Sequence, residues 1–494
     1  MDAAPCDLTG HEIADGLRGG DLSAAEVVES ALARVREVDE RLHAFLLVTG
    51  DQARAAAADV DDRLRRGDPV APVAGVPLAL KDVLTTRGIR TTAGSRILEP
   101  YTPPYDCTPW ARLKESGAAL IGKTNCDEFA MGSSNENSAY GPVHNPWDLE
   151  RVPGGSSGGS AASVAAGEAV WALGTDTGGS VRQPASLCGI VGLKPTYGRI
   201  SRYGLIAFAS SLDHVGTLTH DVRDAATLLS AIAGSDPMDA TSLPSPAHDY
   251  TTALTGDVRG LRVGVVEDWL GMEGVQPGVR DSFRTAVDRL ANLGALVDRA
   301  ELPHADYALS AYYLIAPAEC SSNLARFDGV RYGYRAPDAR DVVDMNMRTR
   351  GDGFGDEVKR RIMLGTYSLS AGYYDAYYGQ AQKVRTLVIR DYERAFEAFD
   401  LLVSPTSPTT AFRLGERTEN PLAMYLSDVF TIPSDLSGTP AISIPCGLAE
   451  EDGMPVGFQV MGRLEDERTV LRAAHALEQD LAFAARPALI SALG

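Results

Sequence analysis

The chain has 494 residues, and 66 Asp and Glu against 46 Lys and Arg give it a formal net charge of −20 at pH 7. Proteins that bind nucleic acid or anionic membranes through their own surface usually carry a basic face, so neither is expected as a direct partner. We also expect no spanning helix and no signal peptide, because the sequence has no long uncharged apolar run and its N-terminus lacks a basic and an apolar region. The six cysteines have no CxxC spacing, which is typical of reduced thiols in a cytoplasmic protein.

The first 70 residues are predicted to be helical. Ser23 and Glu26 form a capping box before apolar residues at helical spacing, and a second predicted helix, about 51–66, stops at Gly67. From Val73 to about Gly234, short apolar runs alternate with Gly-rich turns, as expected for buried strands joined by tight loops.

The second half of the chain also alternates between strands and helices. Residues 261–300 have the pattern of a strand–helix–strand unit, and 357–398 are mostly helical. Three short buried strands and a closing helix are predicted at 401–406, 441–447, 457–462 and about 466–481. This alternation predicts an α/β fold with a mixed or parallel sheet.

We expect one domain over residues 1–494, because no long linker, repeat or low-complexity tract interrupts the chain. Its parts would be N-terminal helices (1–70), an α/β core (71–300 and 400–494) and a peripheral helical part (300–400).

Two general-purpose motifs match in the wrong structural context. Gly117–Thr124 fits GxxxxGK[ST], but a helix is predicted before Gly117 and a strand within the motif, the reverse of a phosphate-binding loop. Residues 154–159 contain GxSxG without the preceding strand that a nucleophile elbow needs. The nearest histidines, His214 and His220, are not obvious bases for it, and no group of residues has metal-ligand spacing.

Two Gly/Ser turns, at 154–160 and 176–180, are more informative because one predicted helix and one predicted strand join them. A Ser that follows two glycines at a strand end has backbone N–H groups nearby that can hold an oxyanion during acyl transfer. A serine nucleophile also needs a base, and a buried neutral lysine can serve. Lys81 ends the apolar run VPLAL, and Lys194 and Lys123 are rival candidates.

The sequence around these turns resembles the amidase signature family. GGSSGGSAA, DTGGSVRQPASLCGIVGLKPT and an upstream Lys-Asp carry the resemblance, with 75 residues from Lys81 to Ser156 and 24 from Ser156 to Ser180. Segments along nearly the whole chain are similar to one branch, the A subunits of bacterial glutamyl-tRNA(Gln) amidotransferases. They are TNCDEFAMGSSNENSAYGPVHNPW, YGRISRYGLIAFASSLDHVG, SSNLARFDGVRYG, IMLGTYSLSAGYYDAYYGQAQKVRTLV and DVFTIPSDLSGTPAISIPCG.

The resemblance implies an amidase-signature fold, a large and mostly parallel mixed sheet with helices on both faces, and a Ser–Ser–Lys triad. Ser180 would be the nucleophile on glutamine, Ser156 the bridge and Lys81 the base. The backbone of Thr177, Gly178 and Gly179 would hold the oxyanion.

The resemblance also implies the substrate contacts. Arg361 and Asp428 would bind the α-carboxylate and α-ammonium of glutamine, and Tyr312 or Tyr313 would line the pocket.

The same resemblance implies the partners. The chain would hold no cofactor itself, while a B subunit would bind tRNA, ATP and Mg²⁺ and receive ammonia, and a small C subunit would wrap both. Whether Glu-tRNA(Gln), Asp-tRNA(Asn) or both are amidated is left open. The alternatives are a free-standing amidase of the same family, a phosphate-loop nucleotide-binding protein that uses Lys123, and an inactive scaffold.

Overall fold

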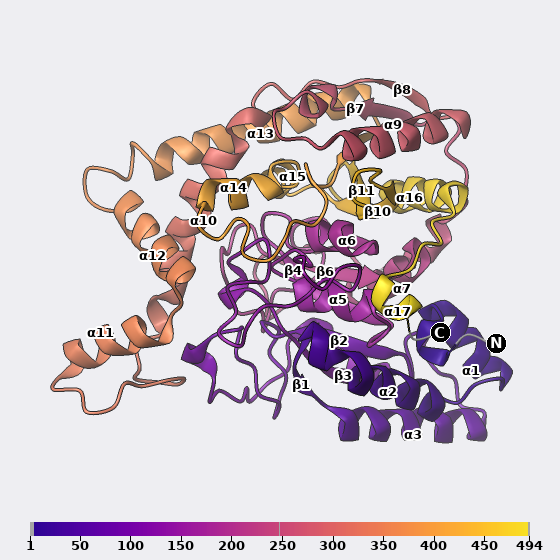
Figure 1. The fold of residues 1–494 in the computed structure, drawn as a ribbon, viewed down its shortest axis with the longest axis horizontal. Helices are drawn as coiled ribbons and strands as arrows, with labels where there is room; N and C mark the ends of the chain where they lie inside the picture. Colours follow the sequence, from indigo (N-terminus) through magenta and orange to yellow (C-terminus); the bar gives the residue numbers. More distant parts are fainter. Residues whose placement is uncertain (1–3, 247, 493–494) are drawn as a thin grey trace.

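The computed structural model describes residues 4–246 and 248–492, and one mixed sheet runs through this part of the chain (Figure 1). Its 11 strands lie in the order β1-β3-β2-β4-β6-β5-β10-β11-β9-β7-β8. The strands are β1 (Phe45–Val48), β2 (Pro77–Lys81), β3 (Ala119–Thr124), β4 (Trp171–Asp176), β5 (Val191–Lys194), β6 (His214–Thr219), β7 (Arg262–Val265), β8 (Leu296–Arg299), β9 (Leu401–Pro405), β10 (Ala441–Leu448) and β11 (Pro455–Gly462).

The helices alternate with these strands along the chain, as the sequence predicted. They are α1 (Gly10–Gly19), α2 (Ala24–Leu42), α3 (Gly50–Arg66), α4 (Thr108–Glu115), α5 (Gly158–Ala165), α6 (Arg182–Cys188), α7 (Val222–Ile232), α8 (Glu267–Leu270), α9 (Pro277–Asn292), α10 (Ala308–Asn323), α11 (Val342–Gly353), α12 (Asp356–Ser368), α13 (Tyr378–Ala398), α14 (Pro421–Tyr425), α15 (Ile432–Ser437), α16 (Glu467–Leu481) and α17 (Ala488–Ser491).

The mixed sheet is confirmed, but the expectation that it is mostly parallel is wrong. Within the described residues, four neighbouring strand pairs are parallel and six are antiparallel. β10 and β11 show one reason, because a short turn joins them and a parallel pair would need a long crossover. The predicted strand–helix–strand unit at 261–300 is parallel, as β7, α9 and β8.

Helices cover both faces of the sheet. A Cβ on Gly457 of β11 would meet Ser186 of α6, whereas one on Gly462 would meet Val470 of α16. Because these glycines are five residues apart on one strand, they point to opposite faces, so α6 and α16 sandwich β10 and β11.

The N-terminal region is helical with one exception. The capping box of Ser23 and Glu26 begins α2, and Gly67 ends α3 in the left-handed conformation, as predicted. Between them lies β1, which pairs with the distant β3 and which the prediction of an all-helical segment missed.

Helices α11 and α12 extend from the side of the body, at the left of Figure 1. The division of the chain into parts stays a prediction. No helix in the described residues combines the length and apolar character needed to cross a membrane. All six cysteines are buried and are not joined in disulfides in this structure, and their reduced state stays a prediction.

Candidate active site

The two Gly/Ser turns meet at the end of strand β2, where Lys81 is located. β2 and β4 are parallel, so the carboxyl end of β2 lies beside the turn that follows β4. The buried amine of Lys81 lies 2.7 Å from Ser156 Oγ, 3.0 Å from Ser157 Oγ and 2.9 Å from Thr175 Oγ1. The structure therefore brings Lys81 and Ser156 into direct contact.

Lys81 is surrounded by hydroxyl groups and has no ion-pair partner among the described residues. Burial disfavours the ammonium form and lowers the pKa of Lys81 to about 8, against the opposing charges of Cys126, Asp127, Asp176 and Asp213. A lysine in these surroundings can hold a neutral amine at a pH close to neutrality, as a base requires.

The hydrogen-bond pattern shows which serine can give a proton to a neutral Lys81. Ser157 Oγ donates its hydrogen to the carbonyl of Thr175 (3.1 Å), so toward Lys81 it can only accept. Ser156 Oγ, at the shortest distance, can instead donate to the amine lone pair. The Lys81–Ser156 contact is thus the one suited to proton transfer.

Backbone contacts hold the Ser180 turn against the Ser156 turn. The N–H of Ser157 donates to the carbonyl of Ser180 (3.2 Å), and Ser157 precedes α5 directly. Gly174 of β4 makes this approach possible, because a Cβ there would lie 2.7 Å from Ser157 Oγ. Ser156 is fully buried and Ser180 is 7% exposed, so Ser180 is the serine of the pair that a ligand can reach.

The turn at 177–180 is shaped by Asp176 and Arg182, to which no role was assigned from the sequence. Asp176 accepts the N–H groups of Gly179 (2.7 Å) and Val181 (3.1 Å), and Arg182 binds both oxygens of Asp176 at 3.0 Å. Burial favours the neutral acid, but Arg182 outweighs it and holds the pKa of Asp176 well below its usual range. Arg182 also reaches Asp435 (2.7 Å), which anchors the turn to α15.

The predicted oxyanion residues are affected differently by these contacts. The N–H of Gly179 donates to Asp176, so in this conformation it is not free to bind an oxyanion. Tyr312 covers Gly178 so closely that a Cβ there would lie 2.8 Å from its hydroxyl. Thr177 is fixed through its own hydroxyl, which donates to Asp213 (2.9 Å). Oxyanion binding by this turn stays a prediction.

Arg361 is buried, although it belongs to a charged helix. It is 3% exposed, and its Nε donates to Glu357 Oε1 at 2.7 Å. Its guanidinium carbon lies 5.4–5.5 Å from the ring centres of Phe208, Tyr313 and Tyr425. These aromatic rings hold the guanidinium of Arg361 in a fixed orientation near Tyr312 and Tyr313 of α10.

Asp428 lies beside the Ser180 turn. Its Oδ2 accepts from Ser133 Oγ (2.5 Å), and its Oδ1 would be 3.3 Å from a Cβ on Gly179. Arg361 is close enough for its charge to oppose the effect of burial on Asp428. No role was assigned from the sequence to Ser133, whose partner is 295 residues away.

The rival bases lie elsewhere. Lys123 is within β3 and pairs with Asp82 (2.9 Å), and the order α4, Gly117, β3 is the reverse of a phosphate loop, as predicted. Lys194 Nζ donates to the carbonyl of Thr439 (2.5 Å). His214 is buried, and burial lowers its pKa well below the usual value.

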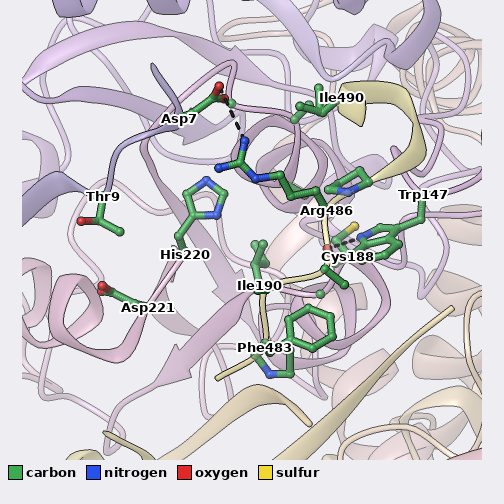
Figure 2. A pocket seen from close by; sticks show the side chains of 18 of the residues that line it. Asp7, Thr9, Trp147, Cys188, Ile190, His220, Asp221, Phe483, Arg486 and Ile490 are labelled. Carbon is green, nitrogen blue, oxygen red and sulfur yellow. Dashed lines mark hydrogen bonds and ion pairs between the residues drawn. The ribbon is translucent and has the colours of Figure 1, made fainter. Parts of the chain in front are cut away.

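A cavity of about 500 Å³ lies at the other ends of α5 and α6, away from these residues (Figure 2). Arg486 points across it toward Asp7, and Trp147 donates to the carbonyl of Cys188. None of the predicted site residues lines this cavity.

Comparisons with known proteins show the family to which the chain belongs. The family model described as Amidase matches residues 26–471. The chain belongs to this amidase family. The glutamyl-tRNA(Gln) amidotransferase A subunit of Rubrobacter xylanophilus is 60% identical and that of Moorella thermoacetica is 57% identical, each over 96% of this chain and 98% and 97% of the relative.

A solved structure shares the fold of this amidase over almost its whole length. The crystal structure of the glutamyl-tRNA(Gln) amidotransferase A subunit from Thermotoga maritima matches with a TM-score of 0.80 and 42% identity, covering 97% of this chain and 96% of that one. The amidase-signature fold expected from the resemblance is therefore confirmed.

Proposed function

We propose that this amidase is the glutaminase component of a tRNA-dependent amidotransferase, which hydrolyses glutamine to glutamate and passes on the ammonia. Two full-length relatives at 57% and 60% identity carry the name of this component. The observation that carries the chemistry is the 2.7 Å contact between buried Lys81 and Ser156, beside the turn that holds Ser180, which is 7% exposed.

The proposed reaction starts with attack by Ser180 Oγ on the side-chain amide carbon of glutamine. Ser156 takes the proton of Ser180 and gives its own to neutral Lys81, and the turn at 177–180 stabilises the oxyanion. When the tetrahedral species collapses, the C–N bond breaks, and the proton returns from Lys81 through Ser156 to the leaving ammonia. Water then hydrolyses the acyl-enzyme through the same relay and yields glutamate.

Selection of glutamine is assigned to Arg361 and Asp428. A guanidinium can bind the α-carboxylate through two parallel hydrogen bonds, and a carboxylate can bind the α-ammonium. Both side chains are buried, Asp428 lies beside the Ser180 turn, and the charge of Arg361 acts on Asp428. Tyr312 of α10 contacts the same turn at Gly178. An amidase acting on uncharged amides would not need this opposed pair, which favours glutamine over the free-standing amidase alternative.

The ammonia is proposed to serve a B subunit that binds ATP, Mg²⁺ and the misacylated tRNA in the cytoplasm, with a C subunit completing the complex. The charge of −20 supports a separation of labour in which another protein of the complex holds the polyanionic tRNA.

Ser180→Ala in the assembled complex tests the proposal. Glutamine-driven amidation of tRNA should fall by at least a thousandfold, while amidation driven by added ammonium salt should remain, because the partner's chemistry is untouched. Loss of both would indicate a structural role for Ser180, and strong hydrolysis of hydrophobic amides with none of glutamine would support the free-standing amidase.

A further inference from the structure

Asp428 has one oxygen with a hydrogen bond and one without. Ser133 Oγ donates to Oδ2 at 2.5 Å, whereas Oδ1 is buried and has no hydrogen-bond partner among the described residues. A carboxylate oxygen without a donor is costly in a buried place, and a proton on that oxygen removes the charge.

The charged groups around Asp428 do not compensate a negative charge there. No cation lies within ion-pair distance of Asp428 in the described part of the chain. Arg361 is paired with Glu357, Arg182 with Asp176 and Asp435, and Tyr312 is uncharged with a raised pKa. Burial raises the pKa of Asp428 to about 8, with Asp176 and Asp435 adding to the rise and Ser133 and Arg361 opposing it.

The unpartnered oxygen lies beside the Ser180 turn. A Cβ on Gly179 would lie 3.3 Å from Asp428 Oδ1 and would clash with Thr431 Oγ1, so glycine at 179 lets the turn approach Asp428 and Thr431 closely. Ser133 holds Oδ2 from the other side and thereby determines which oxygen is presented.

We propose that Asp428 carries a proton on Oδ1 in the free enzyme and releases it to solvent when the α-ammonium of glutamine binds, with Ser133 as the residue that positions the carboxyl group. The proposal rests on the proposed glutaminase function. The balance is simple: the O–H bond breaks, the carboxylate formed pairs with the ammonium, and one proton leaves. Recognition of the amino group is then coupled to pH, and a ligand without that group releases no proton.

Calorimetric titration measures the proton directly. Glutamine is titrated into complex carrying Ser180→Ala, which prevents turnover, in phosphate and in Tris at pH 7. The buffers differ in ionisation enthalpy, so the difference in heat gives the protons released. We expect close to one proton per glutamine at pH 7 and less than half at pH 9, because Asp428 is then ionised before binding and part of the glutamine takes up a proton to bind as the ammonium. Glutaric acid monoamide, which lacks the amino group, should release none.

The outcomes separate this inference from the function on which it rests. Glutamine binding and turnover without proton release at pH 7 would overturn the inference alone. Absence of both glutamine binding and glutaminase activity in the wild-type complex would overturn the proposed function and the inference with it.

Ser133→Ala tests the positioning role, with Ser134→Ala as a matched control. Ser134 is the adjacent buried serine, and its Oγ has no hydrogen-bond partner among the described residues. Loss of the Ser133 donor should raise KM for glutamine roughly tenfold with kcat largely kept, and should move the pH midpoint of KM upward, since Ser133 favours the ionised form. Ser134→Ala should change neither. An unchanged pH midpoint in Ser133→Ala would overturn the positioning role even if KM rises.

Discussion

Lys81 and Lys194 occupy two regions of the molecule that look alike in burial and differ in contacts. Both lysines end a sheet strand, both are fully buried, and burial lowers the pKa of each to about 8. Lys81 contacts three hydroxyl groups, one of which is Ser156 Oγ, and lies 3.5 Å from the carbonyl of Thr175. Lys194 instead donates to the carbonyls of Thr439 and Ser434 and lies 3.9 Å from Asp435.

The difference shows that a lowered pKa alone does not identify a base. A carbonyl has no proton to give, so the contacts of Lys194 can only stabilise its N–H groups. A hydroxyl can both accept and donate, so Lys81 can exchange a proton with Ser156 without moving. We therefore expect Lys81 to take part in the reaction. We expect Lys194 to stabilise the position of α15 through its contacts with carbonyl groups.

The largest expected effect comes from replacing Lys81 with methionine, which keeps most of the volume and removes the amine. We expect kcat for glutamine to fall by about 10²–10⁴-fold, the usual contribution of a general base. Steady-state glutaminase assays of the complex measure the fall, and thermal melting shows whether the chain stays folded. A near-normal rate in Lys81→Met together with a large loss in Lys194→Met would reverse the assignment.

Lys194→Met should affect stability more than rate. The change leaves Asp435 with one cation fewer and the carbonyl of Thr439 without a donor, and removing one member of a buried charged group costs about 3 kcal/mol. Chemical denaturation should show a lower midpoint, while kcat falls less than tenfold because Lys194 does not contact Ser156 or Ser180. A stability equal to that of the wild type would mean that Lys194 does not support α15.

Local sequence patterns predicted the elements whose causes are local. The Ser23–Glu26 capping box and Gly67 specify the limits of α2 and α3 through contacts within a few residues. β1 was missed because its four residues become a strand only through pairing with β3, which is more than 70 residues away. The direction of strands was mispredicted for the same reason, since pairing such as that of β5 with β10 involves distant parts of the chain.

The site divides in a similar way. Lys81, Ser156 and Ser180 were predicted from the Gly/Ser-rich turns, the apolar strand before Lys81 and the family resemblance, all of which are visible in the sequence, and the structure brings Lys81 and Ser156 into contact. Ser133 was missed because its significance depends on Asp428, 295 residues away. Asp176 and Arg182 stand in a motif that carries the family resemblance, but only the structure shows that they engage the Gly179 N–H and reach α15.

The smallest expected effect of these three predictions is the pH dependence of kcat. It sharpens the comparison of Lys81 with Lys194, because it reports on Lys81 while substrate is bound. The proposed base, Lys81, must be neutral. Its neutral fraction rises steeply with pH below its pKa of about 8 and approaches one above it. At saturating glutamine, kcat should therefore rise about tenfold per pH unit below that value and level off above it. Lys194→Met should keep this profile, because the amine it removes takes no part in the relay. The profile is measured from pH 6 to pH 9.5 with the chemical step rate-limiting, as checked by single-turnover kinetics. A kcat that falls as pH rises through 8 would require a protonated Lys81 and would exclude its role as the base, even with the 2.7 Å contact to Ser156 in place.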